Sequence, residues 1–427
     1  MKLKAHRSPN LLPLEILWGR GVPVMSVVGW LSLLAGCLCP FWAVAQIDPV
    51  QRELIQFGYN IATEGHSPFS GYAFYYLNKP NFINTNLTLR LAVAPTYMDS
   101  ELGLSHLLGE NTDVGIGVAG GGYADNYAEI RRGKYLQSES FTGFGGEMSL
   151  SVYHLFNPGA TIPLNGLIRG IGHYTFYARD HKTAPDFDIA NDHATFSIRT
   201  GLRFGGREPI LFPSLAMELS VWYEGYFRTD SGTYGFEGDR KLEPQSHLFW
   251  GEALLAYTLP EWKHNIYVSL TAGTAIEADR FSTYRLGALL PMVSEFPLSL
   301  PGYYYQEISA RDFGLLGVNY IVPLDEKQRW NLNGTFTTAV VDYLPGLEQP
   351  GKWHAGVGAG ILYKTKALKV MVGYAYGVNA IRSDGRGAHS IGLLMQVDWA
   401  KAYDAVFNAD SPNRWRGLQK IFGRFGG

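Results

Sequence analysis

Cysteine and charge are both scarce in this chain of 427 residues. The two cysteines, Cys37 and Cys39, lie within the first 45 residues. Charged residues make up 17% of the chain, whereas a soluble domain has roughly 25%. No stretch after residue 45 is long and apolar enough for a membrane helix. These absences exclude disulfides, thiolate chemistry and helical spans from the chain beyond residue 45.

Residues 1–45 have the features of a secretory signal peptide. Four basic residues precede an apolar run at residues 27–34, and Ala43-Val44-Ala45 then has the small-x-small form of a cleavage site. We therefore expect the mature chain to begin at Gln46. The alternative is a lipidated start at Cys37, because Leu34-Ala35-Gly36-Cys37 is similar to a lipobox.

The chain after residue 45 is slightly acidic. It keeps 32 basic and 37 acidic residues, a net charge of −5. This balance gives no reason to expect nucleic acid as a partner. No pattern in the sequence predicts a cofactor or a metal.

What the chain has instead is many aromatic residues and glycines arranged in alternating runs. There are 26 tyrosines and 50 glycines. In residues 193–204, for example, the even positions Ala194, Phe196, Ile198, Leu202 and Phe204 are apolar and the odd ones are mostly polar. Such period-two faces come from β-strands. The runs span about 9–14 residues, enough to cross a bilayer at a tilt. They predict an all-β fold, a transmembrane antiparallel β-barrel.

The runs predict 16 strands, with short and long links in alternation. They lie near 68–78, 85–94, 98–107, 112–122, 124–132, 141–156, 164–178, 193–204, 215–228, 247–258, 264–275, 312–324, 330–343, 353–364, 368–379 and 389–399. Outer-membrane barrels have short periplasmic turns and longer external loops. We therefore expect a short periplasmic segment at 46–67, with a helix around 50–57, a barrel at 68–399, and a basic periplasmic tail at 400–427 with a helix at 415–425.

Charged side chains on two adjacent strands mark the interior of the barrel. Arg199 and Arg203 face the same side as Glu218 and Glu224 of the next strand. An arginine facing lipid at the midplane would cost about 2–4 kcal/mol. These four residues are expected to line the lumen, either as structural ion pairs or as the selectivity site of a pore.

Five motifs follow one another in residues 264–399: Tyr284-Arg285-Leu286-Gly287, Leu300-Pro301-Gly302-Tyr303, GLLGVNYIVPL at 314–324, Val341-Asp342-Tyr343 and AGVGAGILYKTKALKVMVGYAYG at 355–377. In their order and spacing they resemble the BamA/TamA superfamily of outer-membrane barrels, the bacterial surface antigen family. The resemblance implies 16 strands and a long sixth external loop between strands 11 and 12, here 276–311. It also implies a short member without POTRA domains, with Trp399 closing the last strand.

The resemblance further implies that the sixth loop folds over or into the lumen. The residues expected to form this cap are Arg285, Gly287, Pro301, Gly302, Tyr303 and Tyr304. Pro301 stands where the family has an arginine that pins the loop, so insertase activity is not implied. Three prolines and many apolar residues independently predict an ordered loop, because burial of apolar surface is favourable. The alternative is an external loop that contacts lipopolysaccharide or a partner.

No residue pattern makes a convincing catalytic or metal site. Glu64-Gly65-His66-Ser67 and Asp180-His181 contain residue types used by hydrolases, but adjacent side chains on an extended chain point apart. Asp230, Glu237, Asp239 and Glu243 match no calcium-loop spacing. We interpret all three groups as solvated loop residues.

The sequence thus predicts a non-enzymatic protein of the Gram-negative outer membrane that acts in envelope biogenesis or transport. The alternatives are a passive porin-like channel or structural barrel, and an outer-membrane lipase or protease. The expected partners are outer-membrane lipid, lipopolysaccharide and the barrel-assembly machinery that inserts the chain itself. A plugged lumen with a weak seam between the first and last strands would favour the first reading, and an open lumen would favour the second.

Overall fold

The computed structural model describes residues 48–291, 294–382 and 385–403. The expected cleavage site at Ala43, Ala45 and Gln46, the lipobox alternative and the predicted tail helix at 415–425 lie outside the described residues. Among the described residues, no helix has the length and apolarity needed to span a bilayer.

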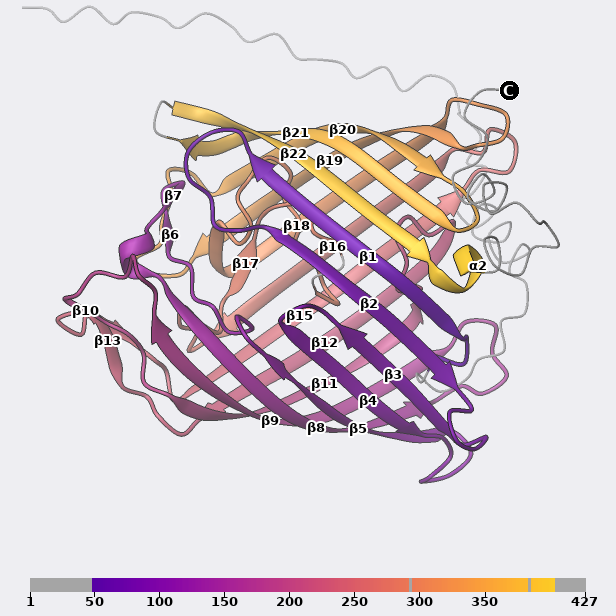
Figure 1. Cartoon of the computed structure of the whole chain (residues 1–427), viewed down its shortest axis with the longest axis horizontal. Helices are drawn as coiled ribbons and strands as arrows, with labels where there is room; N and C mark the ends of the chain where they lie inside the picture. The colour runs from indigo at the N-terminus through magenta and orange to yellow at the C-terminus, as the bar shows by residue number, and fades with distance from the viewer. Residues whose placement is uncertain (1–47, 292–293, 383–384, 404–427) are drawn as a thin grey trace, which may run out of the picture. The chain divides into compact units, whose positions relative to one another are not determined.

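Sixteen antiparallel strands form a closed wall (Figure 1). Each strand pairs with the next along the chain, and the first pairs with the last, as β1 beside β22 shows. The strands of the wall are β1 (Arg52–Ala62), β2 (Gly71–Pro80), β3 (Leu87–Val93), β4 (Tyr97–Leu104), β5 (Thr112–Gly121), β8 (Phe141–Leu155), β9 (Leu164–Arg179), β11 (His193–Gly206), β12 (Leu215–Arg228), β15 (Gln245–Thr258), β16 (Asn265–Ile276), β18 (Ile308–Pro323), β19 (Trp330–Tyr343), β20 (Trp353–Lys364), β21 (Leu368–Arg382) and β22 (Gly385–Asp398).

The remaining elements are short and lie in the links. They are β6 (Ile130–Arg131), β7 (Lys134–Tyr135), the 3-10 helix η1 (Gln137–Glu139), β10 (Phe187–Asp188), β13 (Thr233–Phe236), β14 (Arg240–Lys241), β17 (Tyr284–Leu286) and α2 (Trp399–Tyr403). Figure 1 shows β6, β7, β10 and β13 at one end of the barrel and α2 at the other.

Alternation in the sequence becomes two faces of one wall. Large apolar side chains point outward along most strands of the wall, among them Ile116, Met148, Ile168, Leu219, Val221, Val340, Val372 and Ile391. Buried polar residues occupy the inner face, including Gln56, Glu101, Glu218, Glu224 and Asn333. An apolar outer belt around a polar interior is the arrangement that a lipid bilayer requires. The barrel is therefore an outer-membrane barrel.

The lengths of the links between strands indicate which end of the barrel faces the periplasm. At the end where β1 begins and β22 finishes, the links are short, from 365–367 to 207–214. The opposite end carries the long links 122–140, 180–192, 229–244 and 277–307. Short periplasmic turns and long external loops are the rule for such barrels, so the first end is periplasmic. The link at 277–307 joins strands 11 and 12 of the wall and is called loop 6 below.

Two of the sequence predictions near the start of the barrel are wrong, and their errors cancel in the count of 16. Residues 50–57 are not helical: the wall begins at Arg52, within the segment expected to be periplasmic. Leu54, Gln56 and Asn60 alternate inward, and β1 pairs with both β2 and β22. A helix would satisfy neither neighbouring strand edge, so closure of the barrel overrides the local pattern.

The second error is the wall strand expected at 124–132. This segment belongs to the external link 122–140, where Tyr127 packs on Phe141 and Glu129 is fully buried among loop residues. Its alternation reflects packing between loops rather than the wall. Because of these two errors, the directions expected for the strands between residues 68 and 122 were reversed. In addition, the last strand ends at Asp398, and Trp399 opens α2.

Candidate functional site: the plugged lumen

Loop 6 turns back into the barrel at its first arm. There β17 adds to the inner side of β18 through register pairs such as Leu286 with Ile308, and both side chains are fully buried. Arg285 donates to the carbonyl of Ala128 at 2.6 Å, which ties the arm to the link 122–140. A side chain at Gly287 would overlap the Tyr304 carbonyl. The Arg-Leu-Gly segment therefore lies at the crossing of the two arms of the loop.

The second arm lies directly against the wall. Pro301 and Gly302 approach Gly356 of β20 and Gly377 of β21 so closely that a Cβ on either wall glycine would overlap loop 6, meeting the Pro301 backbone or the Tyr303 ring. Gly302 itself has φ +84°, a conformation that favours glycine. The glycine-rich strands seen in the sequence thus have a local purpose, since they leave room for the backbone of the loop.

The Tyr303 side chain is held in a buried chain of polar contacts. Its hydroxyl lies 3.2 Å from Nδ1 of His354, and the hydroxyl of Tyr343 lies 2.6 Å from Nε2 of the same ring. His354 is 1% exposed and Tyr303 is fully buried. A neutral imidazole has one donor and one acceptor, so it can satisfy both tyrosines. This contact orients the ring of Tyr303 within the lumen.

A buried ion pair pins the same arm, and the sequence reasoning missed it. Arg382, the last residue of β21, donates to both carboxylate oxygens of Glu307 at 2.9 and 3.0 Å. Its guanidinium also stacks 3.7 Å from the ring of Tyr304. The resemblance implied an arginine at the position of Pro301, on the loop. Here the guanidinium comes from the wall and the carboxylate from the loop. Only the pairing of a strand-end arginine with an acidic residue before β18 could have indicated it.

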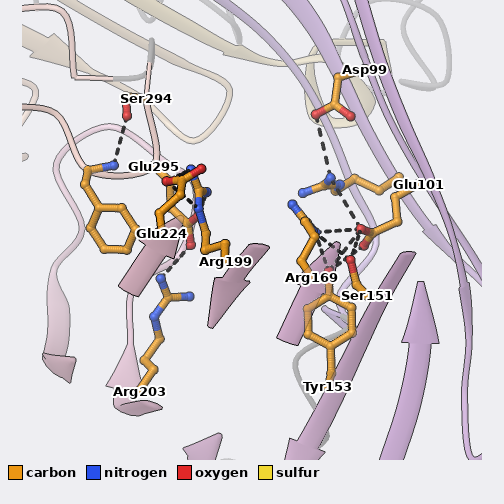
Figure 2. A network of polar contacts seen from close by, with 12 residues as sticks. Asp99, Glu101, Ser151, Tyr153, Arg169, Arg199, Arg203, Glu224, Ser294 and Glu295 are labelled. Carbon is orange, nitrogen blue, oxygen red and sulfur yellow. Dashed lines mark hydrogen bonds and ion pairs between the residues drawn. The ribbon is translucent and has the colours of Figure 1, made fainter. Parts of the chain in front are cut away.

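Farther into the lumen, loop 6 contributes a carboxylate to the charges that the sequence placed there (Figure 2). Arg199 lies 2.9 Å from Glu224 and Arg203 lies 3.0 Å from Glu218. Glu295 bridges the two arginines, at 2.5 Å from Arg203 and 3.6 Å from Arg199. Burial alone would raise the pKa of Glu295, but the two guanidinium groups outweigh it and lower the pKa to about 2. Glu295 is therefore a carboxylate at neutral pH.

A second charge network lines the neighbouring part of the wall. Glu101 of β4 accepts from Arg169 of β9 at 2.7 Å and from the hydroxyl of Tyr153 at 2.9 Å. Arg90 of β3 lies 3.9 Å from the same carboxylate. Figure 2 shows this cluster beside the cluster of Arg199 and Glu224. The alternation pattern does not join Arg169 to Glu101, since the two residues are 68 positions apart in the chain and lie on strands that do not pair.

External links build a cover over the lumen. Tyr127, Phe141, Phe187, Ala190, Tyr234 and Leu242 form its apolar core. Arg240, which is 3% exposed, pairs with Glu139 and lies 3.7 Å from Glu129. Burial alone would lower the pKa of Arg240. The negative charges around the guanidinium, that of Glu129 foremost, outweigh this effect and raise the pKa above its usual value. Arg228 and Asp279, 2.8 Å apart, join β12 to loop 6 beneath this cover.

Some of the hydrolase-like and calcium-like candidates border this buried arrangement, since the carbonyl of Glu64 accepts from the Tyr304 hydroxyl at 2.8 Å and Asp239 lies 3.6 Å from Arg240. His66 is exposed in the external link 63–70, and the contact between Asp180 and His181 is also exposed. Asp239 and Glu243 instead interact with Arg240 and Lys241. Within the described residues, no group of three or more histidine or acidic side chains could hold a metal ion.

The junction of the first and last strands is fully paired. Leu54–Ala62 and Asp398–Ser390 are register partners without interruption. This differs from the weak seam considered with the sequence. Loop 6 thus packs against the inside of the wall, and the pairing of the wall strands is continuous around it.

Comparisons with known proteins support the fold. No family model and no curated protein matches the sequence. The chain is similar in structure to CdiB from Escherichia coli, with TM-score 0.55 and 13% identity over 82% of this chain and 63% of that chain. CdiB from Acinetobacter baumannii matches with TM-score 0.53 and 8% identity over 81% of this chain and 60% of that chain. BamA from Haemophilus ducreyi lacking POTRA domains 1–3 matches with TM-score 0.51 and 10% identity over 81% of this chain and 70% of that chain. The chain thus spans less than two thirds of the length of either CdiB chain. Its fold is that of the 16-stranded BamA-type barrels of the outer membrane, as the sequence motifs predicted.

Proposed function

We propose that this protein is a non-enzymatic outer-membrane barrel that acts in envelope biogenesis or transport and is gated by loop 6. The observation that carries the proposal is the seating of loop 6, whose Leu286, Leu300 and Tyr303 are fully buried. A passive pore needs a free water path. A lumen occupied by an ordered, ion-paired loop favours a barrel that opens only when the loop moves.

Two ion-paired anchors would control that movement. The pair of Arg382 with Glu307 holds the upper part of the arm, and Glu295 with Arg203 holds the part deeper in the lumen. Both anchors use charged hydrogen bonds, which are stronger than neutral ones. Their release in concert would clear the lumen without any change in the wall.

Conductance in planar bilayers tests the gate. The intact barrel should conduct little, and deletion of residues 291–305 should give a steadily open channel. Arg382→Gln should open the barrel intermittently. Arg311→Gln is the matched control, because Arg311 pairs with Asp312 and Asp342 on the exposed rim of the barrel. A folded deletion variant that stays closed, or an intact barrel that conducts freely, would count against gating by this loop.

A second measurement separates biogenesis from passive transport. Cells that lack the protein should show altered composition of their outer-membrane proteins or lipopolysaccharide if it acts in biogenesis. A passive channel would change only the uptake of solutes. A protein that also needs the assembly machinery for its own insertion should accumulate unfolded in the periplasm when that machinery is depleted.

A further inference from the structure

The periplasmic link between β11 and β12 folds into the barrel, unlike other links at this end. Its sequence is Arg-Glu-Pro-Ile-Leu-Phe-Pro-Ser, residues 207–214. Several large apolar side chains in other links at this end are exposed: Ile83 is 77%, Leu108 63% and Trp262 65% exposed. Leu211 is only 3% exposed. We call residues 207–214 the inner strut.

Leu211 packs against strands on the far side of the wall. Its buried neighbours are Ile321 of β18, Leu362 of β20, Met371 of β21 and Leu394 of β22. The link itself leaves the wall between strands 8 and 9 of 16, so it reaches across the lumen to strands 12, 14, 15 and 16. The inner strut therefore connects opposite sides of the barrel.

Polar contacts attach the inner strut to both strands that close the barrel. The carbonyl of Pro209 accepts from Gln56 of β1 at 3.3 Å, and the amide of Leu211 donates to Gln396 of β22 at 2.8 Å. Gln56 and Gln396 are register partners and hydrogen bond to each other at 3.2 Å.

Two charged groups extend the attachment. Glu208 lies 3.2 Å from Arg52 of β1, and Lys369 of β21 donates to the carbonyl of Leu211. The inner strut thus contacts β1 through its first half and β21 and β22 through its second half.

The strands β1 and β22 form the junction that most needs such support. Every other neighbouring pair in the wall is joined by a link of the chain, which keeps the two strands at high effective concentration. At the junction of β1 and β22 the partners come from the two ends of the barrel, so only non-covalent contacts oppose separation. A brace from the opposite wall would compensate for the missing link.

The inner strut has the rigidity that a brace requires. Pro209 and Pro213 restrict its backbone, and Phe212 is held at φ 51°, a conformation that is costly for a non-glycine residue. Its first residue is also anchored, since Arg207 donates to the Tyr267 hydroxyl at 3.1 Å and to the Glu295 carbonyl. A strained, anchored segment is held by its contacts rather than by its own preference.

We propose that the inner strut clamps the β1–β22 junction from inside the lumen and that the junction can separate only after the inner strut withdraws. This inference does not rest on gating by loop 6, because it concerns the wall and not the water path. Amide hydrogen exchange measures the opening of the β1–β22 junction directly, since amides in a paired strand exchange when the pairing opens.

The test is Leu211→Ser in the full-length protein in lipid vesicles, followed by amide hydrogen exchange. Exchange should rise at least 10-fold in β1 and β22 and stay unchanged in β8 and β9, which contribute no residue to the apolar cluster around Leu211 in the described part of the chain. Leu324→Ser is the matched control, because Leu324 lies in the periplasmic link 324–329 and is exposed. The milder Glu208→Gln should raise exchange a few-fold near Arg52 only.

A disulfide across the junction completes the test. Tyr59 and Leu393 are outward-facing register partners, and no cysteine follows residue 39. Oxidised Tyr59→Cys with Leu393→Cys should restore slow exchange in the Leu211→Ser variant. Equal exchange in the junction of wild type and variant overturns the proposal, as does a rise spread over the whole barrel. If Leu211→Ser alone fails to give the folded band, which in SDS gels migrates differently before and after boiling, rescue of that band by the disulfide supports the clamp. Failure of that rescue, with Glu208→Gln also silent, refutes it.

Discussion

Arg169 of β9 and Arg199 of β11 are register partners inside the barrel, yet their guanidinium groups bind different carboxylates. Arg169 turns to Glu101 at 2.7 Å and Arg199 turns to Glu224 at 2.9 Å. Like charges directly opposite on neighbouring strands destabilise a sheet unless each has a partner. The lumen charges therefore form two networks. Glu101 ties β4 to β9 in the first, and Glu224 ties β12 to β11 in the second.

The first prediction concerns the pair of Arg199 and Glu224. Arg199→Gln should destabilise the barrel by about 3 kcal/mol, because it leaves a buried carboxylate without its partner. The double variant with Glu224→Gln should cost less than Arg199→Gln alone. Urea unfolding in lipid vesicles gives the double-mutant cycle. Strictly additive effects would mean that the two residues do not share an environment.

The second prediction concerns the anchor of loop 6 on the wall. Arg382→Glu should release the loop, because two carboxylates would then face each other, and should raise sensitivity to large antibiotics. The exchange Arg382→Glu with Glu307→Arg should restore part of the barrier, since both groups are buried and bidentate. A double variant as leaky as Arg382→Glu would show that charge pairing does not hold the loop.

The third prediction uses two glycines of the wall. Gly356→Ala should unseat the Pro301 segment, because its Cβ would overlap the Pro301 carbonyl. Gly314→Ala on β18 is the control, since open space surrounds that position. Each variant would also carry Tyr305→Cys as a labelling site. Reaction of this cysteine with a maleimide should become faster with Gly356→Ala and stay slow with Gly314→Ala. Equal labelling in both would show that the close approach is not needed to seat the loop.

The fourth prediction addresses the external cover. Arg240→Gln should loosen the links 122–140 and 229–244, because Glu129 and Glu139 would lose a buried cation. Proteinase K added to intact cells should then cut these links faster. Lys241→Gln, next in sequence and exposed, should leave cleavage unchanged. A resistant Arg240→Gln variant would mean that the apolar core alone holds the cover.

The alternation of apolar and polar residues was sufficient to predict most of the wall. From residue 141 onward every wall strand was anticipated, because there one face meets lipid and the other meets the lumen. The prediction failed at β1, where the segment was interpreted as a short amphipathic helix although Ile55, Phe57, Tyr59 and Ile61 alternate with the inward-facing Gln56, Gly58 and Asn60. It failed again at 124–132, where contacts between loops produced a similar alternation.

Parts of the lumen could also be anticipated. Arg199, Arg203, Glu218 and Glu224 were placed together because adjacent strands share a face. Glu295, Arg382 and Glu307 were not, because their partners depend on the path of loop 6 through the barrel. Local sequence carries the period of a strand, but a contact such as Leu211 with Gln396, 185 residues apart, depends on closure of the whole ring.

The position of the inner strut also has a consequence for the order in which the protein acquires its structure. Its partners lie 153 residues earlier, at Gln56, and 185 residues later, at Gln396. Contacts between such distant segments are slow to form, because the intervening chain must first be ordered. Full burial of Leu211 therefore requires β18, β20, β21 and β22 to be in place, which makes it a late event in the assembly of the wall.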